Sequence, residues 1–256
     1  MLSKNRISTI QKLHQKKFRM QENLFIAEGA KIVPEILSSA KDTVQVIATQ
    51  KWIDSNQGIL LNHQVEVALP QDFEKISSLS TAPEVLAICS IPNDLQPVYA
   101  AGSFVLLLDA IRDPGNLGTI IRLADWFGVD AIVASSDCVE WTNPKVIQAS
   151  MGSFIRIRPF YTNLQDFIEK LPQQCPLLAA DLEGENLYTS NFIPEGCLVL
   201  SSESHGLSEY LEHLISRKVH IPRGLNSSEK TESLNVATAA AIFLSEFTRR
   251  RAFSSH

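Results

Sequence analysis

Four short, continuously apolar segments dominate the second part of this chain, and each is followed by a turn and a stretch with helical periodicity. They are residues 104–108, 131–134, 177–180 and 198–200. Strands that are apolar on both faces and separated by helices are typical of a parallel sheet covered on both sides. The pattern therefore predicts an α/β fold for this part of the chain.

The first part of the chain shows a similar alternation, with strands expected at residues 24–26, 44–48, 65–69 and 86–91. From residue 91 to residue 103 the sequence is instead rich in turn formers, including Pro92, Pro97 and Gly102. We therefore predict two α/β domains, a smaller one over residues 1–97 and a larger one over residues 98–256.

Composition excludes several classes of protein. The chain has 256 residues, 45% of them hydrophobic, but no stretch approaches the length of apolar sequence that a membrane span needs. Its first residues lack the apolar segment of a signal peptide. The cysteines form no C-x-x-C pair, which argues against a disulfide scaffold and a zinc site; they are Cys89, Cys138, Cys175 and Cys197. We expect a cytoplasmic protein without a metal.

The net charge of −5 argues against a protein that coats nucleic acid through its overall field. Local basic patches remain. Six basic residues precede Glu22, the first acidic residue, and three arginines lie at 249–251; the first group is Lys4, Arg6, Lys12, Lys16, Lys17 and Arg19. Such a run is either a solvated end of the chain or a contact surface for an anionic partner.

A turn-forming motif follows the strand at 104–108. Asp113-Pro114-Gly115-Asn116 has proline second and glycine third, which favours a type II turn before a helix that ends near Gly128. The turn would present Asn116 at the carboxyl end of the sheet, where open α/β sheets bind ligands. Arg122 follows within the helix. Neither a G-x-G-x-x-G nor a phosphate-loop pattern is present, which disfavours dinucleotide and triphosphate sites.

Two further loops carry polar groups. The strand at 198–200 leads into a loop over 201–208, in which Glu203 is either a general base in a cleft or an acid in the first turn of a helix. Later, Ile221-Pro222 precedes a polar loop, and Ser233 is a candidate N-cap for an alanine-rich helix. A serine hydrolase is disfavoured because no G-x-S-x-G motif is present.

Taken in order, these segments resemble the SpoU, or TrmH-like, RNA 2′-O-methyltransferases of the SPOUT superfamily. The matching stretches are 113–118 with Arg122 and 127–128, the middle region 141–152, 202–208, 221–222 and 232–237. Residues 25–31 resemble the ribosomal-protein-like RNA-binding domain of many members. The resemblance implies a deep trefoil knot in the C-terminal domain, S-adenosylmethionine bound in the knot, and a homodimer whose active site combines both subunits.

The resemblance also assigns residues. It implies an active site of Asn116, Arg122, Glu203, Ser233 and Asn235. It implies cofactor binding by Leu200, Ser201, Ser202, Ser204, Gly206, Ile221 and Leu234. A guanidinium stays protonated, so Arg122 is expected to hold a phosphate or stabilise the developing alkoxide. Glu203 and Ser233 are expected to orient the ribose and pass on the proton. RNA contact is expected from Lys4, Arg6, Lys12, Lys16, Lys17, Arg19 and Lys31.

The chain departs from the family pattern at three positions. Ser201 and Ser204 stand where the family usually has glycine, and Arg223 stands where it often has methionine. Glycine lets the backbone approach a cofactor closely. An RNA-binding or assembly protein that keeps the fold without methylation is therefore the main alternative. As substrate, the separate N-terminal domain favours ribosomal over transfer RNA.

Overall fold

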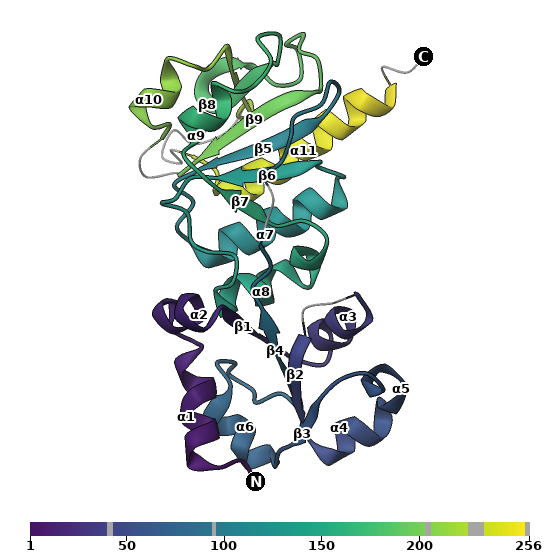
Figure 1. Cartoon of the computed structure of the whole chain (residues 1–256). Coiled ribbons are helices and arrows are strands. Elements are labelled where there is room, and N and C mark those ends of the chain that lie inside the picture. The colour runs from purple at the N-terminus through teal and green to yellow at the C-terminus, as the bar shows by residue number, and fades with distance from the viewer. Residues whose placement is uncertain (40–42, 94–95, 203–205, 225–232, 254–256) are drawn as a thin grey trace. The chain divides into compact units, whose positions relative to one another are not determined.

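The structure, a computed structural model, describes residues 1–39, 43–93, 96–202, 206–224 and 233–253 (Figure 1). The chain forms two compact units. Unit 1 comprises Met1–Asp94 together with Glu140–Ile155, and unit 2 comprises Leu95–Val139 together with Arg156–His256. The prediction placed one boundary between residues 97 and 98, so it did not anticipate that residues 140–155 group with unit 1.

An aromatic cluster explains this grouping. The ring of Phe25 packs edge-on against Trp141 and Phe154, with ring centroids 5.1 and 5.9 Å apart. Gln148 donates a hydrogen bond of 2.8 Å to the backbone carbonyl of Glu28. Residues from the middle of the sequence thus complete the core of unit 1.

Unit 1 contains a four-stranded sheet in the order β1-β4-β2-β3. β4 is antiparallel to β1 and β2, and β2 is parallel to β3. The strands are β1 (Leu24–Glu28), β2 (Thr43–Ala48), β3 (Val65–Val67) and β4 (Val85–Ser90), close to the predicted segments. The helices are α1 (Lys4–Lys12), α2 (Lys16–Glu22), α3 (Ile32–Ser39), α4 (Gln50–Ser55), α5 (Gln57–Leu60), α6 (Pro70–Ile76) and α8 (Pro144–Ser150), with a 3-10 turn at Ser153–Ile155.

Unit 2 contains six strands in the order β10-β8-β9-β5-β6-β7, and every pair is parallel. This confirms the predicted α/β fold. The strands are β5 (Phe104–Asp109), β6 (Ala131–Ala134), β7 (Pro159–Tyr161), β8 (Leu177–Asn186), β9 (Gly196–Ser201) and β10 (Arg217–His220). The helices are α7 (Pro114–Trp126), α9 (Leu164–Ile168), α10 (Glu209–Glu212) and α11 (Val236–Phe253).

Apolar side chains cover both faces of the sheet in unit 2. Leu107, Val133 and Val199 pack with Phe167 and Leu211 in one buried cluster. Elsewhere in the unit, Phe247 of α11 stacks on Phe104 of β5, with ring centroids 4.6 Å apart. This explains why the sequence of the central strands is apolar without alternation. Among the described helices, none has the length and apolar character needed to cross a membrane.

Two helix starts differ from the predictions. Residues 113–116 do not form a free type II turn, because Asp113 caps α7 and Pro114 is its first residue. Asn235, rather than Ser233, caps α11: its side-chain oxygen accepts hydrogen bonds from the backbone N–H groups of Ala237 and Thr238 at 3.0 and 3.3 Å. Gly128 follows the end of α7 with a φ of +66°, as predicted.

Candidate active site

A cavity of about 720 Å³ opens in unit 2 along β8, at the ends of β9 and β10, and beside the start of α11. Its lining includes most of the residues predicted to bind a cofactor: Leu200, Ser201, Ser202, Gly206, Ile221 and Leu234. Ser233, predicted to be catalytic, also lines it. Ser204 and Glu203 lie outside the described residues. Segments 180–183, 200–207, 218–224 and 233–243 thus contribute to one cavity, while Asn116, Arg122 and Asn235 are not among its described lining residues.

The two predicted asparagines lie next to each other beside this cavity. Asn235 Nδ2 donates a hydrogen bond of 2.8 Å to Asn116 Oδ1, although 119 positions separate them. Asn116 is fixed in turn because its backbone N–H donates to Asp113 Oδ1 at 2.8 Å. Asn235 is fixed by capping α11. Both side chains are thus oriented by helix N-termini.

Arg122 lies on α7 with an exposed side chain. Its side chain makes no ion pair or hydrogen bond to any residue within the described ranges.

A group of charged residues that the sequence analysis missed lines another side of the cavity. Lys218 Nζ pairs with Asp181 Oδ2 at 2.9 Å and with Glu212 Oε1 at 3.3 Å. The hydrogen bond to Asp181 raises the pKa of Lys218. Burial opposes ionisation of Asp181, but the backbone N–H of Glu183 and the ammonium of Lys218 outweigh it, and the pKa is lowered. The pKa shifts of Asp181 and Lys218 both favour the charged form of the pair.

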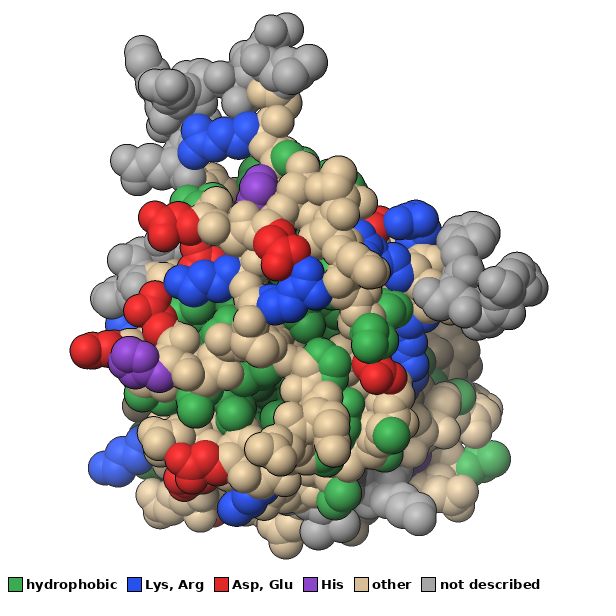
Figure 2. Space-filling view, turned by 90° about the horizontal axis from the view of Figure 1, so that it is seen from above, with side chains coloured by type: hydrophobic (Ala, Val, Ile, Leu, Met, Phe, Trp, Pro, Cys, Tyr) green, Lys and Arg blue, Asp and Glu red, His purple; other side chains and the backbone are tan. Residues whose placement is uncertain are grey.

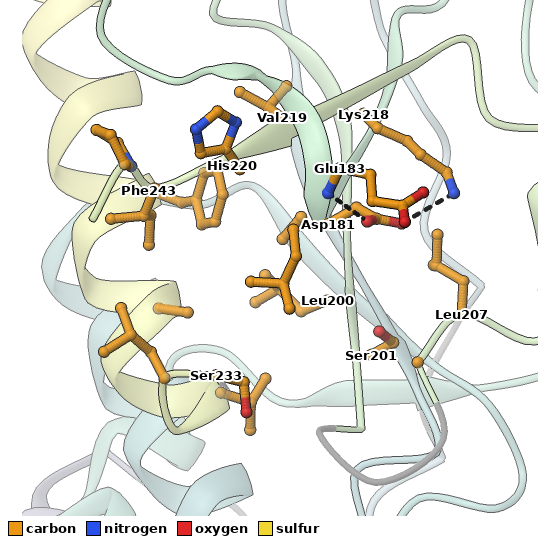
Figure 3. Close-up of a pocket in the computed structure, with 18 of the residues that line it drawn as sticks. Asp181, Glu183, Leu200, Ser201, Leu207, Lys218, Val219, His220, Ser233 and Phe243 are labelled. Carbon is orange, nitrogen blue, oxygen red and sulfur yellow. Dashed lines mark hydrogen bonds and ion pairs between the residues drawn. The ribbon is translucent and has the colours of Figure 1, made fainter. Parts of the chain in front are cut away.

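The close-up shows how the cavity is divided. Asp181, Glu183 and Lys218 lie together on one side, His220 and Phe243 lie on the other, and Leu200 lies between them (Figure 3). One signal in the sequence pointed to Asp181: it follows the predicted strand at 177–180, and ligands bind at the carboxyl ends of such strands.

The predicted RNA-contacting residues of unit 1 fall into two groups. Five have exposed side chains, namely Lys4, Lys12, Lys16, Lys17 and Lys31. Arg6 is half-buried, and its Nε pairs with Glu66 Oε2 at 3.0 Å. Lys16 also pairs with Glu140, at 3.6 Å.

For Arg19 the prediction of RNA contact is wrong. Its side chain is 1% exposed. The guanidinium pairs with Glu140 and donates to the backbone carbonyls of Leu13 and His14 at 3.0 and 2.7 Å. Burial lowers the pKa of Arg19, while Glu140 opposes that shift. A buried guanidinium with these partners cannot reach a phosphate, so Arg19 holds unit 1 together.

The arginine run at the end of α11 is likewise used within the fold. Glu246 pairs with Arg249 and Arg250, each at 2.7 Å. The hydrogen bond from Arg249, helped by Arg250, lowers the pKa of Glu246 to about 2. Arg250 also stacks on Phe192 and donates to two backbone carbonyls. On the face of the protein seen from above, acidic and basic side chains are interspersed (Figure 2).

The fold and the cavity define an α/β protein with a ligand site at one edge of a parallel sheet. Residues 103–245 match the model of the SpoU rRNA Methylase family, and residues 4–87 match the MRM3-like substrate binding domain. The chain therefore belongs to the SpoU rRNA methylase family.

Three relatives illustrate the similarity. The chain is 30% identical over 240 residues to the 23S rRNA (guanosine(2553)-2′-O)-methyltransferase RlmP of Bacillus subtilis, covering 91% of this chain and 92% of the relative. A structure from Porphyromonas gingivalis assigned to the TrmH family of RNA methyltransferases is 35% identical, with a TM-score of 0.84 and 98% and 99% coverage. An AdoMet-bound rRNA methyltransferase from Sinorhizobium meliloti is 26% identical, with a TM-score of 0.82 and 99% and 97% coverage.

Proposed function

We propose that this protein transfers a methyl group from S-adenosylmethionine to a ribose 2′-hydroxyl of ribosomal RNA. The observation that carries the proposal is the convergence of three loops around one cavity, with the Asn116–Asn235 pair beside it. Family membership and the named activities of relatives such as RlmP support the same chemistry.

The cavity suits S-adenosylmethionine in size and in chemistry. At about 720 Å³ it falls within the range of small-molecule sites. Leu200, Ile221, Val236 and Phe243 offer apolar surface for an adenine ring. Among the described lining residues, three are acidic, Asp181, Glu183 and Glu212, and two are basic, Lys218 and Arg223; this excess of acidic groups favours a cationic ligand. When bound, S-adenosylmethionine supplies an electrophilic methyl group on a sulfonium.

The residues of the chain have mainly a positioning task. Holding two reactants in line can lower the barrier by about 7 to 11 kcal/mol. Help from a general base typically raises the rate by about 10² to 10⁴-fold, which corresponds to a smaller lowering of the barrier. Asn116 and Asn235 are held by helix N-termini and can orient the ribose. Arg122, which is exposed, can hold the phosphate beside the reacting nucleotide or stabilise the developing alkoxide. Ser233 at the cavity, and Glu203, are proposed to pass on the proton of the 2′-hydroxyl.

RNA is the matching nucleic acid because only RNA has the reacting 2′-hydroxyl. The match to a substrate binding domain supports a role for unit 1 in holding it. We assign phosphate contacts to the five exposed lysines, Lys4, Lys12, Lys16, Lys17 and Lys31. Ribosomal RNA is preferred over transfer RNA because the relatives that span most of this chain include ribosomal RNA methyltransferases.

Three further properties are part of the proposal. The C-terminal domain is proposed to form a trefoil knot, and α11, which packs against α7 and β9, is the element expected to close it. A homodimer is proposed because the family resemblance implies one, and the exposed Trp126 at the end of α7 is the kind of side chain that interfaces cover. The cytoplasm is the proposed location.

Two measurements test the function. Calorimetry with purified protein should detect S-adenosylmethionine binding. Ribose methylations should then be mapped in ribosomal and transfer RNA from cells with and without the gene. Loss of a ribosomal ribose methylation is expected. Loss from transfer RNA alone would favour the alternative substrate, and no loss from either would contradict the enzymatic proposal.

The alternative of an RNA-binding protein without methylation rests on Ser201 and Ser204 in place of the usual glycines. Ser201 lines the cavity, so its side chain approaches a bound cofactor. Replacing Ser201 with glycine distinguishes the two functions. If the serine blocks the cofactor, the substitution will create binding that the natural protein lacks.

A further inference from the structure

β5 ends in a buried carboxylate that the proposed chemistry does not use. Asp109 is the last residue of this strand, at the carboxyl end of the sheet, and is 2% exposed. Burying an ionised carboxylate is costly unless it is paired or hydrogen-bonded. Its partners therefore indicate what the residue does.

Among the described residues, one distant residue donates two hydrogen bonds to this carboxylate. The backbone N–H of Ser208 donates to Asp109 Oδ2 at 2.8 Å, and Ser208 Oγ donates to Asp109 Oδ1 at 2.9 Å. Within the described ranges Asp109 forms no ion pair. Its backbone carbonyl also accepts from the N–H of Ser202 at 3.1 Å. Asp109 thus holds Ser202 and Ser208, the two ends of one loop.

The described residues next to these two ends form part of the cavity wall. Ser202, Gly206 and Leu207 line the cavity, and Ser201 and Leu207 face it together in the close-up (Figure 3). Ser202 and Gly206 are joined to each other, because the N–H of Gly206 donates to the carbonyl of Ser202 at 2.9 Å. A shift of either end would therefore move the cavity wall.

On the other side of Asp109 the chain turns toward Asn116. Ala110 has a φ of +54°, an unfavourable conformation for a residue with a side chain. It is held there because its N–H donates to Ser135 Oγ at 3.0 Å and the N–H of Ile111 donates to Cys138 Sγ at 3.2 Å. Asp109 therefore lies between two loops of the site and is braced on both sides.

We propose that Asp109 is a positioning residue for methyl transfer, which acts by fixing Ser202 and the segment 206–208 beside the cofactor cavity. This inference rests on the proposed function. A carboxyl group suits the role because its two oxygens accept from the N–H and the hydroxyl of Ser208 at the same time.

The experiment uses the full chain with Asp109→Asn, Ser208→Ala and the double variant. Asparagine keeps the shape but offers one acceptor oxygen where aspartate offers two. Asp130→Asn is the matched control, because Asp130 Oδ2 accepts a hydrogen bond of 2.7 Å from the N–H of Phe104 at the opposite end of β5. Measurements are the unfolding temperature, S-adenosylmethionine Kd by calorimetry, RNA Kd, and kcat of methyl transfer.

Asp109→Asn is expected to weaken S-adenosylmethionine binding about tenfold and to lower kcat about tenfold or more, with RNA affinity unchanged. Ser208→Ala should act in the same direction but less strongly. The Kd and kcat of the double variant should be the same as those of Asp109→Asn, because both substitutions disrupt the same contact between Asp109 and Ser208. Asp130→Asn should lower only the unfolding temperature.

Equal effects of Asp109→Asn and Asp130→Asn on kcat would overturn the proposal, as would additive effects in the double variant. If Asp109→Asn does not fold, Ser208→Ala decides, and normal kcat and Kd in that variant refute the positioning role. Wild-type protein that binds S-adenosylmethionine without transferring methyl would contradict the proposed function. The effect of Asp109→Asn on Kd would still test the positioning role.

Discussion

The cavity of unit 2 and the basic arm of unit 1, which is the run of basic residues from Lys4 to Arg19, differ in the roles of their polar groups. Beside the cavity, Asn116 and Asn235 come together from distant parts of the sequence and are oriented by helix caps. In the basic arm, neighbouring residues have unlike roles, since Lys17 is exposed while Arg19 is buried against Glu140. A motif at a strand end is located by the topology of the sheet, whereas a charge run does not reveal which of its members is buried.

The largest expected effect concerns Arg19. Arg19→Ala leaves Glu140, which is 15% exposed, without its buried partner, and should lower the free energy of unfolding by about 3 to 5 kcal/mol. Denaturant unfolding measures the change. Lys17→Ala, at an exposed neighbouring position, serves as the control and should change stability by under about 0.5 kcal/mol. If Arg19→Ala had normal stability but bound RNA more weakly, Arg19 would have to be counted among the residues that contact RNA.

The second prediction concerns the asparagine pair. Asn235→Ala removes the hydrogen bond to Asn116 and should reduce methyl transfer on the order of 10²-fold, by analogy with the loss of one preorganised hydrogen-bonding group. It also removes the cap of α11, which costs about 1 kcal/mol. Asn163→Ala is the matched control, because Asn163 caps α9 in the same unit. The Asn163→Ala variant should lose similar stability and keep full activity. Equal losses of activity in both variants would mean that Asn235 has only a structural role.

The third prediction tests whether the C-terminal arginine run belongs to the fold. The pKa of Glu246 is about 2 when folded, below its ordinary value of 4.5. A lowered folded pKa stabilises the protein above about pH 4.5, and this stabilisation is lost as the pH falls toward 2. Glu246→Gln should therefore lower stability at pH 7 by about 2 kcal/mol, after allowance for the exposed Arg249.

Unfolding measured against pH checks this expectation. The difference between Glu246→Gln and the wild type should shrink as the solution is acidified. A difference that stays constant from pH 7 to pH 2 would mean that the ionised carboxylate of Glu246 is not the source of the lost stability.

The smallest effects are expected in the basic arm. Lys12→Ala and Lys17→Ala should each weaken RNA binding a few-fold and reduce the salt dependence of log Kd by about one unit if each lysine contacts a phosphate. Titrations at several salt concentrations measure the slope. Lys51→Ala is a control in the same unit, because Lys51 pairs with Glu84 on the surface. If the slope of log Kd against log salt concentration is unchanged in both test variants, these lysines do not contact RNA phosphates and the arm is a solvated end of the chain.

The fold could be predicted from the sequence because its signals are local and repeated. Apolar runs such as 104–108 and 198–200 became neighbouring parallel strands, with Leu106 opposite Leu198. The boundary was harder, since the attraction of Phe25 for Trp141 and Phe154 is a long-range contact with no local pattern.

The site was predictable only in part. The family resemblance indicated Asn116 and Asn235, but not the hydrogen bond that joins them. The ion pairs of Lys218 with Asp181 and Glu212 depend on how β8, β10 and α10 meet, which no spacing in the sequence encodes. Similarly, no sequence pattern links Asp109 to its hydrogen-bond partner Ser208, which is 99 positions away.

One measurement tests the central claim most directly. Wild-type protein is incubated with ribosomal RNA and S-adenosylmethionine labelled in the methyl group, the RNA is digested to nucleosides, and the labelled product is identified by mass spectrometry. The account predicts that the label appears in a 2′-O-methylribose and that Asn235→Ala largely abolishes it. Label found on a base, or no label under conditions in which S-adenosylmethionine is bound, would contradict the account.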